Sequence, residues 1–335
     1  MEEHEQEPAR TGPGAHSFLL RSGIAAVLAA VGGGLGLVAW LGPLPQEKPG
    51  TASAPGPEAE PRPEPPEPPP LPPLELERVT GESGEELLAR LRRLGSPEWP
   101  PESRVVPVTT GELPADLAEL RVEQRKEVFF RVLTPIVLAE NARLREARGF
   151  VQRSAGRLDE LSADEQRRLE ALAAYYGVER DGEGFTERLL RRLDEVPVSL
   201  ALAQAANESG WGTSRFTREG NNLFGEWTWT EEGLVPQQRE AGKSHRVRIF
   251  PSLKASVRSY LHNLNTHRAY AGFRERRAAM RERGEPLDGA ALAGGLKAYS
   301  ERGSAYIEEL RAMIRYNGLE RLRGLRLAEA VPKGE

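Results

Sequence analysis

The chain has 335 residues, of which 39% are hydrophobic and 29% charged, and a formal net charge of −4. That length corresponds to about two domains. The 46 basic and 50 acidic residues nearly balance, unlike the strongly basic surface typical of nucleic-acid binding, so we expect no nucleic-acid partner. The chain has no cysteine, which excludes disulfides, thiolate metal sites and cysteine nucleophiles.

An uncharged apolar stretch follows the polar first 21 residues. Residues 22–44 carry no charge, and as a helix they would span about 34 Å, enough to cross a bilayer. The glycines in this stretch would weaken a buried core helix, whereas membrane helices tolerate them. A cleaved signal peptide is the alternative, but the preceding segment is acidic and the small residues Ala52–Ser53–Ala54 precede a proline. We therefore predict an uncleaved transmembrane anchor over residues 22–44.

The basic residues that flank this anchor predict its orientation. Arg10 and Arg21 precede it, and the next basic residue is Lys48. Because basic residues favour the cytoplasmic side, we expect a cytoplasmic tail over residues 1–21. The protein would then cross the cytoplasmic (inner) membrane once, with the remainder in the periplasm. Gly32 and Gly36 form a GxxxG pair, which suggests weak self-association through the membrane helix.

Proline dominates the segment that follows the anchor. Residues 43–73 hold 14 of the 27 prolines. Such a stretch cannot build a core and favours extended polyproline II, which at about 3.1 Å per residue reaches roughly 90 Å. We predict a proline-rich linker over residues 45–75 that acts as a spacer. A docking site for another protein is the alternative.

Hydrophobic periodicity predicts a mainly α-helical protein after the linker. Residues 76–195 form a helical accessory region without evident chemistry. Pro135 would kink or break its longest helix, and Ser162 with Glu165 has the spacing of a capping box. The predicted helices of this region cover residues 85–94, 120–148, 162–176 and 186–193.

Residues 196–325 form the second region, in which a helix begins at Pro197 and ends at Gly210. Its four alanines indicate a central buried helix. Glycine, tryptophan, threonine and valine concentrate in residues 220–250, which predict one twisted hairpin and the chain's only convincing strands. Further helices are predicted over residues 253–265, 270–283, 290–299 and 306–316, with a stop at Asn317–Gly318 and a loose tail beyond Leu327.

Glu208, near the end of the alanine-rich helix, has the surroundings that a general acid requires. Gly210, Trp211 and Gly212 follow it closely. A carboxyl that emerges from a buried helix beside an indole loses hydration, which raises its pKa toward the working pH. A protonated carboxyl can donate to a glycosidic oxygen as the bond breaks. The alternative is an exposed glutamate at a helix end without a chemical role.

Aromatic and amide side chains follow this glutamate. Trp211, Phe224, Trp227 and Trp229 offer faces on which sugar rings could stack, although such residues also fill protein cores. Asn222 either binds substrate or bridges a turn. We take Trp211, Asn222, Phe224 and Trp227 as the candidate substrate-binding residues.

Two motifs, NESGWGTSRF at 207–216 and GNNLFG at 220–225, resemble the glucosaminidase family of bacterial wall hydrolases, glycoside hydrolase family 73. The resemblance is closest to its Bax-like subgroup, which residues 125–148 and 296–319 also resemble, so it covers roughly residues 74–325. It implies a lysozyme-like α lobe, a small β-hairpin lobe and a groove between them. It also implies cleavage of peptidoglycan glycan strands beside N-acetylglucosamine, with Glu208 as the catalytic acid.

The resemblance leaves the second catalytic group open. Family members commonly carry another acidic residue in the β lobe, at a variable position. Glu240, just before the predicted strand HRVRIF, is our first choice, and Glu226, Glu231 and Glu232 are its rivals. A second carboxylate close to Glu208 would favour retention of configuration, and a wider gap would leave room for an inverting water.

A third route uses the acetamido oxygen of the substrate as the nucleophile, with a tyrosine assisting. Tyr299 and Tyr306 match tyrosine positions in the closing segment of the family. Many members have threonine–aspartate–proline between these tyrosines, whereas this chain has Ser-Glu-Arg-Gly-Ser at 300–304. That departure is consistent with the Bax-like subgroup.

No metal or cofactor is expected, because glycosidase chemistry by two carboxyls requires none. His245, His262 and His267 are the only histidines beyond the anchor, and none lies in an HExxH motif. A lytic transglycosylase and a non-catalytic glycan-binding envelope protein are the alternative functions. The continuation NNLFG, in place of a Gly-Leu-Met-Gln stretch, favours the glucosaminidase.

Overall fold

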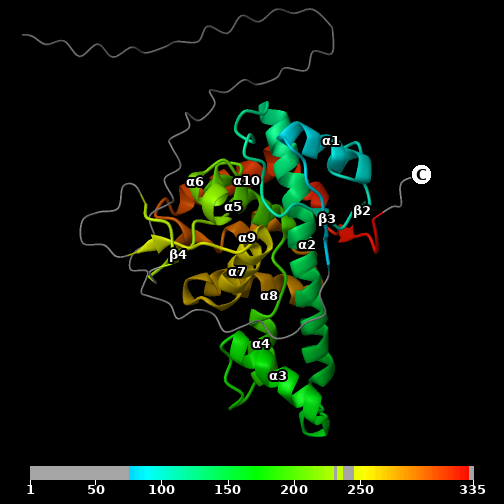
Figure 1. Ribbon diagram of the computed structural model, residues 1–335. Helices are drawn as coiled ribbons and strands as arrows, with labels where there is room; N and C mark the ends of the chain where they lie inside the picture. The colour runs from blue at the N-terminus through cyan, green and yellow to red at the C-terminus, as the bar shows by residue number, and fades with distance from the viewer. Residues whose placement is uncertain (1–74, 230–231, 237–244, 332–335) are drawn as a thin grey trace, which may run out of the picture. The chain divides into compact units, whose positions relative to one another are not determined.

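The computed structural model describes residues 75–229, 232–236 and 245–331, and helices make up most of their regular structure (Figure 1). The predicted mainly α-helical fold is confirmed. The predicted tail, anchor and nearly all of the linker, residues 1–74, lie outside the described residues. Within the described ranges, no helix is both long and apolar enough to span a membrane.

The elements are α-helices of 5 to 33 residues, short 3-10 helices and strands of two residues. In chain order they are β1 (Glu77–Arg78), α1 (Gly84–Leu94), β2 (Arg104–Val105), β3 (Val108–Thr109), α2 (Val122–Ser154), η1 (Leu158–Glu160), α3 (Ala163–Tyr175), α4 (Phe185–Arg192), α5 (Val198–Ser209), α6 (Arg215–Gly220), β4 (Trp227–Thr228), β5 (Arg246–Val247), α7 (Leu253–Thr266), η2 (Arg268–Tyr270), α8 (Ala271–Glu282), α9 (Gly289–Ala293), η3 (Lys297–Tyr299), α10 (Ser304–Tyr316), η4 (Leu319–Leu322) and β6 (Arg326–Leu327).

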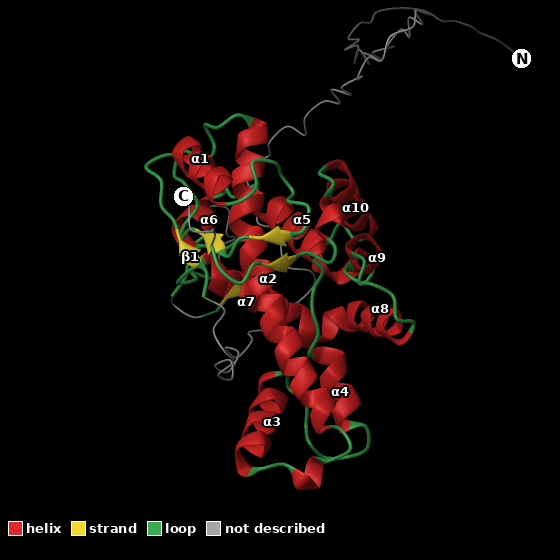
Figure 2. Cartoon of the chain, turned by 90° about the vertical axis from the view of Figure 1, so that its right-hand side faces the viewer, coloured by secondary structure: helices red, strands yellow, loops and turns green. Residues whose placement is uncertain are grey.

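Helix α2 is one continuous helix of 33 residues that includes Pro135. Every residue from Val128 to Asn141 is buried. A proline inside a helix costs about 3 kcal/mol, and packing of this buried segment on its neighbours outweighs that local cost. The predicted break at Pro135 therefore does not occur. Helices α3 and α4 lie beside the C-terminal end of α2 (Figure 2), where Arg168 of α3 pairs with Glu146 of α2.

The other helix predictions differ from the structure mainly at their ends. The capping box of Ser162 and Glu165 is present at the start of α3. The helix predicted over residues 290–299 divides into α9 and η3. A Cβ on Gly295 would lie 2.4 Å from the Cα of Phe273, so the glycine permits α8 to approach at the point where the helix ends.

Three pairs of short strands are present among the described residues. The predicted hairpin is confirmed as the antiparallel pair β4–β5, in which Trp227 lies opposite Val247. Two parallel pairs, β1–β3 and β2–β6, were not predicted. In the second pair, β6 pairs with β2 and the Ala328 amide then donates to the Val105 carbonyl at 2.8 Å. The C-terminal segment is thus attached to the accessory region, at least through Ala328.

Helix α5 lies at the centre of the hydrophobic core, as predicted. Its residues from Leu200 to Ala206 are at most 1% exposed, and the helix packs on α2, α9 and α10. Four alanines keep its surface flat, so neighbouring helices approach it from several sides. The accessory region and residues 196–325 share this core and belong to one compact unit.

An ion pair between a half-buried arginine and a buried carboxylate joins α2 to α7. The Arg258 guanidinium donates two hydrogen bonds to the Glu140 carboxylate, each of 2.9 Å. The Glu140 side chain is only 4% exposed, and Arg143 and Lys254 lie within 4.0 Å of it. A buried carboxylate is tolerated when it is paired and hydrogen-bonded in this way.

Removing the charge at position 140 should destabilise the protein. We expect Glu140→Gln to lower the free energy of unfolding by about 2 kcal/mol, because three basic groups lose their counter-charge. The matched control is Glu170→Gln, since Glu170 pairs with Arg180 on an exposed surface and such pairs contribute less than about 1 kcal/mol. Urea denaturation of both variants measures the difference, and equal losses would contradict the assignment.

Candidate active site

Helix α5 ends just after Glu208 and leaves that side chain half-buried at the edge of the core. Gly210 ends the helix in the left-handed conformation, with φ of 57°. The Ser209 hydroxyl accepts a 2.8 Å hydrogen bond from the Gly212 amide and donates to the Ala205 carbonyl. The turn after the helix is thereby held against its last residues.

Trp211 joins this turn to helix α2. Its indole packs edge-on against Phe129 and Phe130, with ring centroids 5.8 and 5.4 Å apart, and the Lys126 ammonium lies 4.8 Å from its ring centroid. A Cβ on the following Gly212 would lie 2.4 Å from a methyl of Leu113, so only glycine fits there. The ring is only partly buried, and its role as a sugar platform stays a prediction.

Tyr306 of α10 is the direct partner of Glu208. The Tyr306 hydroxyl donates to Glu208 Oε1 at 2.8 Å and accepts from Gln204 Nε2 at 2.9 Å. The Tyr260 hydroxyl of α7 donates to Gln204 Oε1 at 2.6 Å. Helices α5, α7 and α10 therefore meet in a line of polar contacts that ends on the carboxyl.

Burial raises the pKa of the Glu208 carboxyl above its ordinary value, and the hydrogen bonds from Tyr306 and Asn207 oppose part of that rise. The positive charge of Arg302 also lowers this pKa, whereas Glu309 raises it. A carboxyl whose pKa is raised toward neutrality is suited to donate a proton. Burial and the neighbouring Glu208 raise the pKa of Tyr306 well above its usual range, so its hydroxyl keeps its proton.

Asn222 has a structural role in the turn that leads into the hairpin. Its side chain donates to the carbonyls of Glu226 and Arg248, both at 2.8 Å, and accepts from the Glu226 amide at 2.9 Å. The residue is 2% exposed. These three contacts use both amide protons and the oxygen, so the turn-bridging interpretation replaces the predicted substrate contact.

Phe224 lies in the core and does not form an exposed stacking face. It is 3% exposed, and its ring stacks on Tyr260 with centroids 3.9 Å apart and planes 4° from parallel. The Tyr299 hydroxyl donates to the Phe224 carbonyl at 3.3 Å, and the Tyr299 ring lies parallel to Tyr306. The predicted sugar-stacking role of Phe224 is therefore corrected to one of support for the tyrosines.

The structure places only some of the candidates for the second acidic group. Glu226 lies at the base of the hairpin, where its Oε2 accepts a 2.7 Å hydrogen bond from the Ser259 hydroxyl of α7. Glu232 is exposed on the hairpin. Glu240 and Glu231 lie outside the described residues. The Trp227 ring, on β4, packs edge-on against the His245 ring, with ring centroids 4.1 Å apart.

The comparisons with known proteins bear on this site directly. A family model named glucosaminidase, described as mannosyl-glycoprotein endo-beta-N-acetylglucosaminidase, matches residues 187–319. Protein Bax of Escherichia coli (strain K12) is 35% identical over 196 residues, which cover 58% of this chain and 70% of that protein. The chain belongs to the glucosaminidase family, in its Bax-like group. No solved structure gives a significant match.

Membership of the glucosaminidase family makes a glycoside hydrolase the expected class of enzyme. The matched residues run from α4 to the start of η4 and so include α5, the hairpin, α7 and α10. Every described site residue lies within that range. The resemblance inferred from the two motifs is confirmed.

Sequence reasoning missed Gln204 and Tyr260. Gln204 was a detectable signal, since its amide side chain interrupts the alanine-rich run one helical turn before Glu208, on the same face of the helix. Tyr260 gave no comparable signal. It lies 56 residues from Gln204 in the chain, and its spacing in α7 is that of an ordinary core residue.

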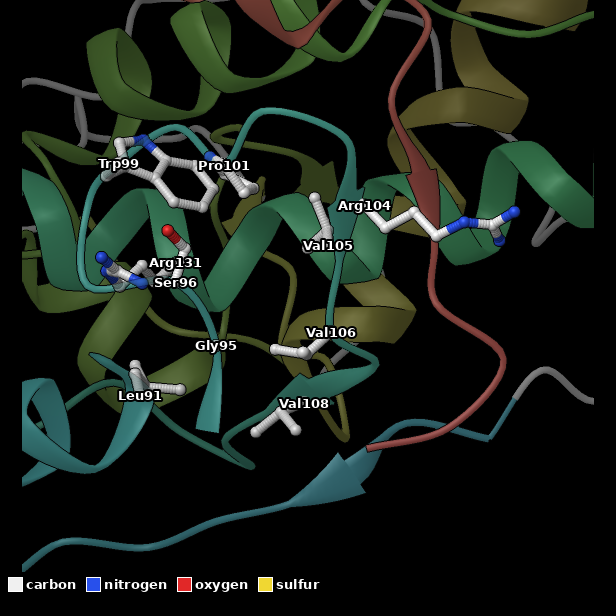
Figure 3. Close-up of a pocket in the computed structure, with 10 residues that line it drawn as sticks. All are labelled: Leu91, Gly95, Ser96, Trp99, Pro101, Arg104, Val105, Val106, Val108 and Arg131. Atoms are coloured by element: carbon white, nitrogen blue, oxygen red, sulfur yellow. The ribbon is translucent and has the colours of Figure 1, made fainter. Parts of the chain in front are cut away.

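A pocket elsewhere in this glucosaminidase-family chain holds none of the candidate residues. It lies between α1, the following loop and α2 (Figure 3), and the Arg131 guanidinium faces the Trp99 ring at 5.4 Å. Its lining includes no carboxylate, so it offers no group for acid catalysis. The described residues also contain no cluster of three or more acidic or histidine side chains suited to a metal ion. The pocket is lined by Leu91, Gly95, Ser96, Trp99, Pro101, Arg104, Val105, Val106, Val108 and Arg131.

Truncating Asn222 should loosen the hairpin. We expect Asn222→Ala to lower the free energy of unfolding by about 2 kcal/mol, because buried backbone groups lose their partners. Asn317→Ala is the matched control, since Asn317 follows the last residue of α10, is only half-buried and bonds one backbone carbonyl and the Lys126 ammonium. Its truncation should cost less than about 1 kcal/mol. Thermal denaturation compares the two, and similar losses would argue against the structural role of Asn222.

Removing the Tyr306 hydroxyl should shift the ionisation of Glu208. The hydroxyl donates to the carboxylate and so lowers the pKa of Glu208. Tyr306→Phe is therefore expected to raise that pKa further, as measured by a carboxyl ¹³C NMR titration. Tyr299→Phe is the comparison, because its hydroxyl bonds a backbone carbonyl. A lowered or unchanged pKa in Tyr306→Phe would contradict the assigned direction of the hydrogen bond.

Proposed function

We propose that this protein is a peptidoglycan hydrolase that cleaves the glycosidic bond beside N-acetylglucosamine, with Glu208 as the general acid. The observation that carries the proposal is the half-buried Glu208 carboxyl, whose pKa is raised by burial and which is held by Tyr306 at the end of α5. Family membership supports the reaction class. In the reaction, Glu208 transfers its proton to the glycosidic oxygen as the bond to the anomeric carbon breaks.

Tyr306 acts on Glu208 in this proposal and is not itself the nucleophile. Its hydroxyl is fully buried, bonded on both sides and strongly resistant to ionisation. The positive charge that develops at the anomeric carbon must therefore be stabilised by another carboxylate or by the acetamido oxygen of the substrate. Tyr299, parallel to Tyr306, remains the tyrosine candidate for assisting the acetamido group.

Glu226 and Glu240 are the two leading candidates for the second carboxylate. Ser259 holds Glu226 from α7, so its carboxylate has a defined position relative to the helical region. Glu240, which lies outside the described residues, remains the first choice from the sequence. Comparing Glu226→Gln with Glu240→Gln separates them, since the variant that lacks the second catalytic group should lose activity about as strongly as one that lacks the acid.

We also propose a lysozyme-like arrangement, in which the helices around α5 form one lobe and the β4–β5 hairpin forms the other. The glycan strand would then pass between these lobes, over Glu208. The proposed location is the periplasmic side of the inner membrane, with residues 22–44 as the anchor and with weak self-association through Gly32 and Gly36. A linker of roughly 90 Å suits a substrate that lies some distance from the bilayer.

Replacing Glu208 tests the proposal. Wild-type protein is expected to digest purified sacculi, and Glu208→Gln should retain less than about one hundredth of that activity, because a positioned general acid contributes at least that factor. Glu308→Gln is the control, since Glu308 is exposed on α10. Equal activity in wild type and Glu208→Gln would reject the catalytic role.

The products of the same digestion decide between hydrolysis and the alternative reaction. A glucosaminidase leaves a reducing N-acetylglucosamine end, whereas a lytic transglycosylase leaves an anhydro-muramic end. Mass spectrometry of the released fragments distinguishes the two. Binding to sacculi without any cleavage would support a non-catalytic glycan-binding role.

A further inference from the structure

Four side chains from three helices form one continuous line of hydrogen bonds. It runs from Tyr260 on α7 through Gln204 on α5 and Tyr306 on α10 to Glu208 on α5, with distances of 2.6, 2.9 and 2.8 Å. Tyr260, Gln204 and Tyr306 are each 0% exposed. Water therefore has no access with which to replace a missing partner, and each member depends on the next.

The direction of this line follows from Glu208. During its reaction cycle the carboxyl loses its proton, and an ionised carboxylate can only accept hydrogen bonds. The Tyr306 hydroxyl must then donate its single proton to Glu208 Oε1. Its oxygen is left to accept from Gln204 Nε2, which turns Gln204 Oε1 toward the Tyr260 hydroxyl. The four groups thus have one consistent arrangement when Glu208 is ionised.

Among the described residues, two hydrogen bonds reach the Glu208 carboxyl, and both end on the same oxygen. Tyr306 donates to Oε1, and the Asn207 side-chain amide donates to Oε1 at 3.4 Å. A proton placed on Oε1 would face these two donors. The protonated carboxyl therefore carries its proton on Oε2.

We infer that Gln204 and Tyr260 are positioning residues that orient Tyr306 and thereby assign the catalytic proton to Oε2 of Glu208. This inference rests on the proposed role of Glu208 as the acid. Neither residue touches the carboxyl, so both act through the Tyr306 hydroxyl. Gln204 has the stronger effect because it contacts that hydroxyl directly, and Tyr260 acts by holding the Gln204 amide in one orientation.

The far end of the line is packed against the GNNLFG motif. The Phe224 ring covers one face of the Tyr260 ring, with ring centroids 3.9 Å apart. The Leu223 amide donates to the hydroxyl of Ser256, which lies one turn before Tyr260 on α7. The motif therefore holds the ring whose hydroxyl begins the line. This contact gives buried Phe224 a role in the site without contact to substrate.

Three other charged or titratable groups among the described residues also act on Glu208. They are Arg302 in the loop before α10, Glu309 on α10 and Tyr299 on η3. Arg302 lies 5.4 Å from the centroid of the Tyr306 ring. A shift in Glu208 ionisation on altering Gln204 or Tyr260 would thus report the loss of the line, provided these groups are unchanged.

The test uses the full-length chain with Gln204→Met and Tyr260→Phe, and Tyr176→Phe as a matched control. Tyr176 is a buried tyrosine at the end of α3, outside the line. Two quantities are measured: the titration of the Glu208 carboxyl by ¹³C NMR, assigned as the resonance absent from Glu208→Gln, and the pH dependence of kcat/KM on peptidoglycan fragments.

Both variants are expected to raise the pKa of Glu208, because the bond that favours its ionised form weakens. The alkaline limb of the kcat/KM profile should move to higher pH in parallel, since activity needs the protonated acid. Gln204→Met should lower kcat about tenfold with little change in KM, which corresponds to about 1.4 kcal/mol of lost transition-state stabilisation. Tyr260→Phe should also raise the pKa of Glu208 and lower kcat, but each change should be smaller than in Gln204→Met. Tyr176→Phe should change neither the pKa nor kcat.

A Glu208 titration that stays at the wild-type pH in folded variants would overturn the inference, as would a loss of kcat without movement of the alkaline limb. If Gln204→Met does not fold, Tyr260→Phe decides alone, because it keeps the ring that stacks on Phe224. Failure of the proposed function has a different signature. In that case the wild-type chain would not digest peptidoglycan, while the NMR titration would still report the hydrogen-bonded line.

Discussion

Helix α5 consists mostly of alanine, leucine and valine, but it carries the polar side chains Gln204 and Glu208 one turn apart on the side that meets α7 and α10. Burying such groups without partners would cost about 1–3 kcal/mol each, and more for a charge. The structure meets this requirement with two tyrosines from different helices, Tyr260 and Tyr306. The helices that surround α5 are therefore constrained in position by polar contacts as well as by apolar packing.

Helix α7 supports the site from several sides at once. Its Arg258 is held by Glu140 of the accessory region, and its Ser256 and Ser259 bind the Leu223 amide and the Glu226 carboxylate. The adjacent Tyr260 begins the line that ends on Glu208. The accessory region thus supports the candidate active site indirectly, through its ion pair with α7.

Sequence periodicity was sufficient to predict most helices, since a stripe of apolar residues indicates which face of a helix is buried. It failed where a local preference competed with packing. Pro135 predicted a kink or a break, and no break occurs because the buried α2 continues through it. The glycine pair before η3 ends a helix that the apolar pattern would continue. The parallel strand pairs escaped prediction because two residues are too few to show an alternating pattern, and their partners are distant in the chain.

The sequence alone predicts Glu208 as the candidate acid, because a carboxyl at the end of an alanine-rich helix, followed by glycines and an indole, is a local arrangement. The family motif lies in the same short segment. The sequence also determined where α5 ends, since Gly210 adopts the left-handed conformation that other residues disfavour.

Only the tertiary structure decided which side chains hold the carboxyl. Gln204 and Tyr306 are 102 residues apart in the chain. A hydrogen bond between them forms only if the fold places the two groups to within tenths of an ångström. Periodicity records only whether a residue faces the core, so it could not distinguish Tyr260 and Tyr306 from other buried aromatic residues. For the same reason it could not show that the Phe224 ring packs on a tyrosine and is not available to a sugar.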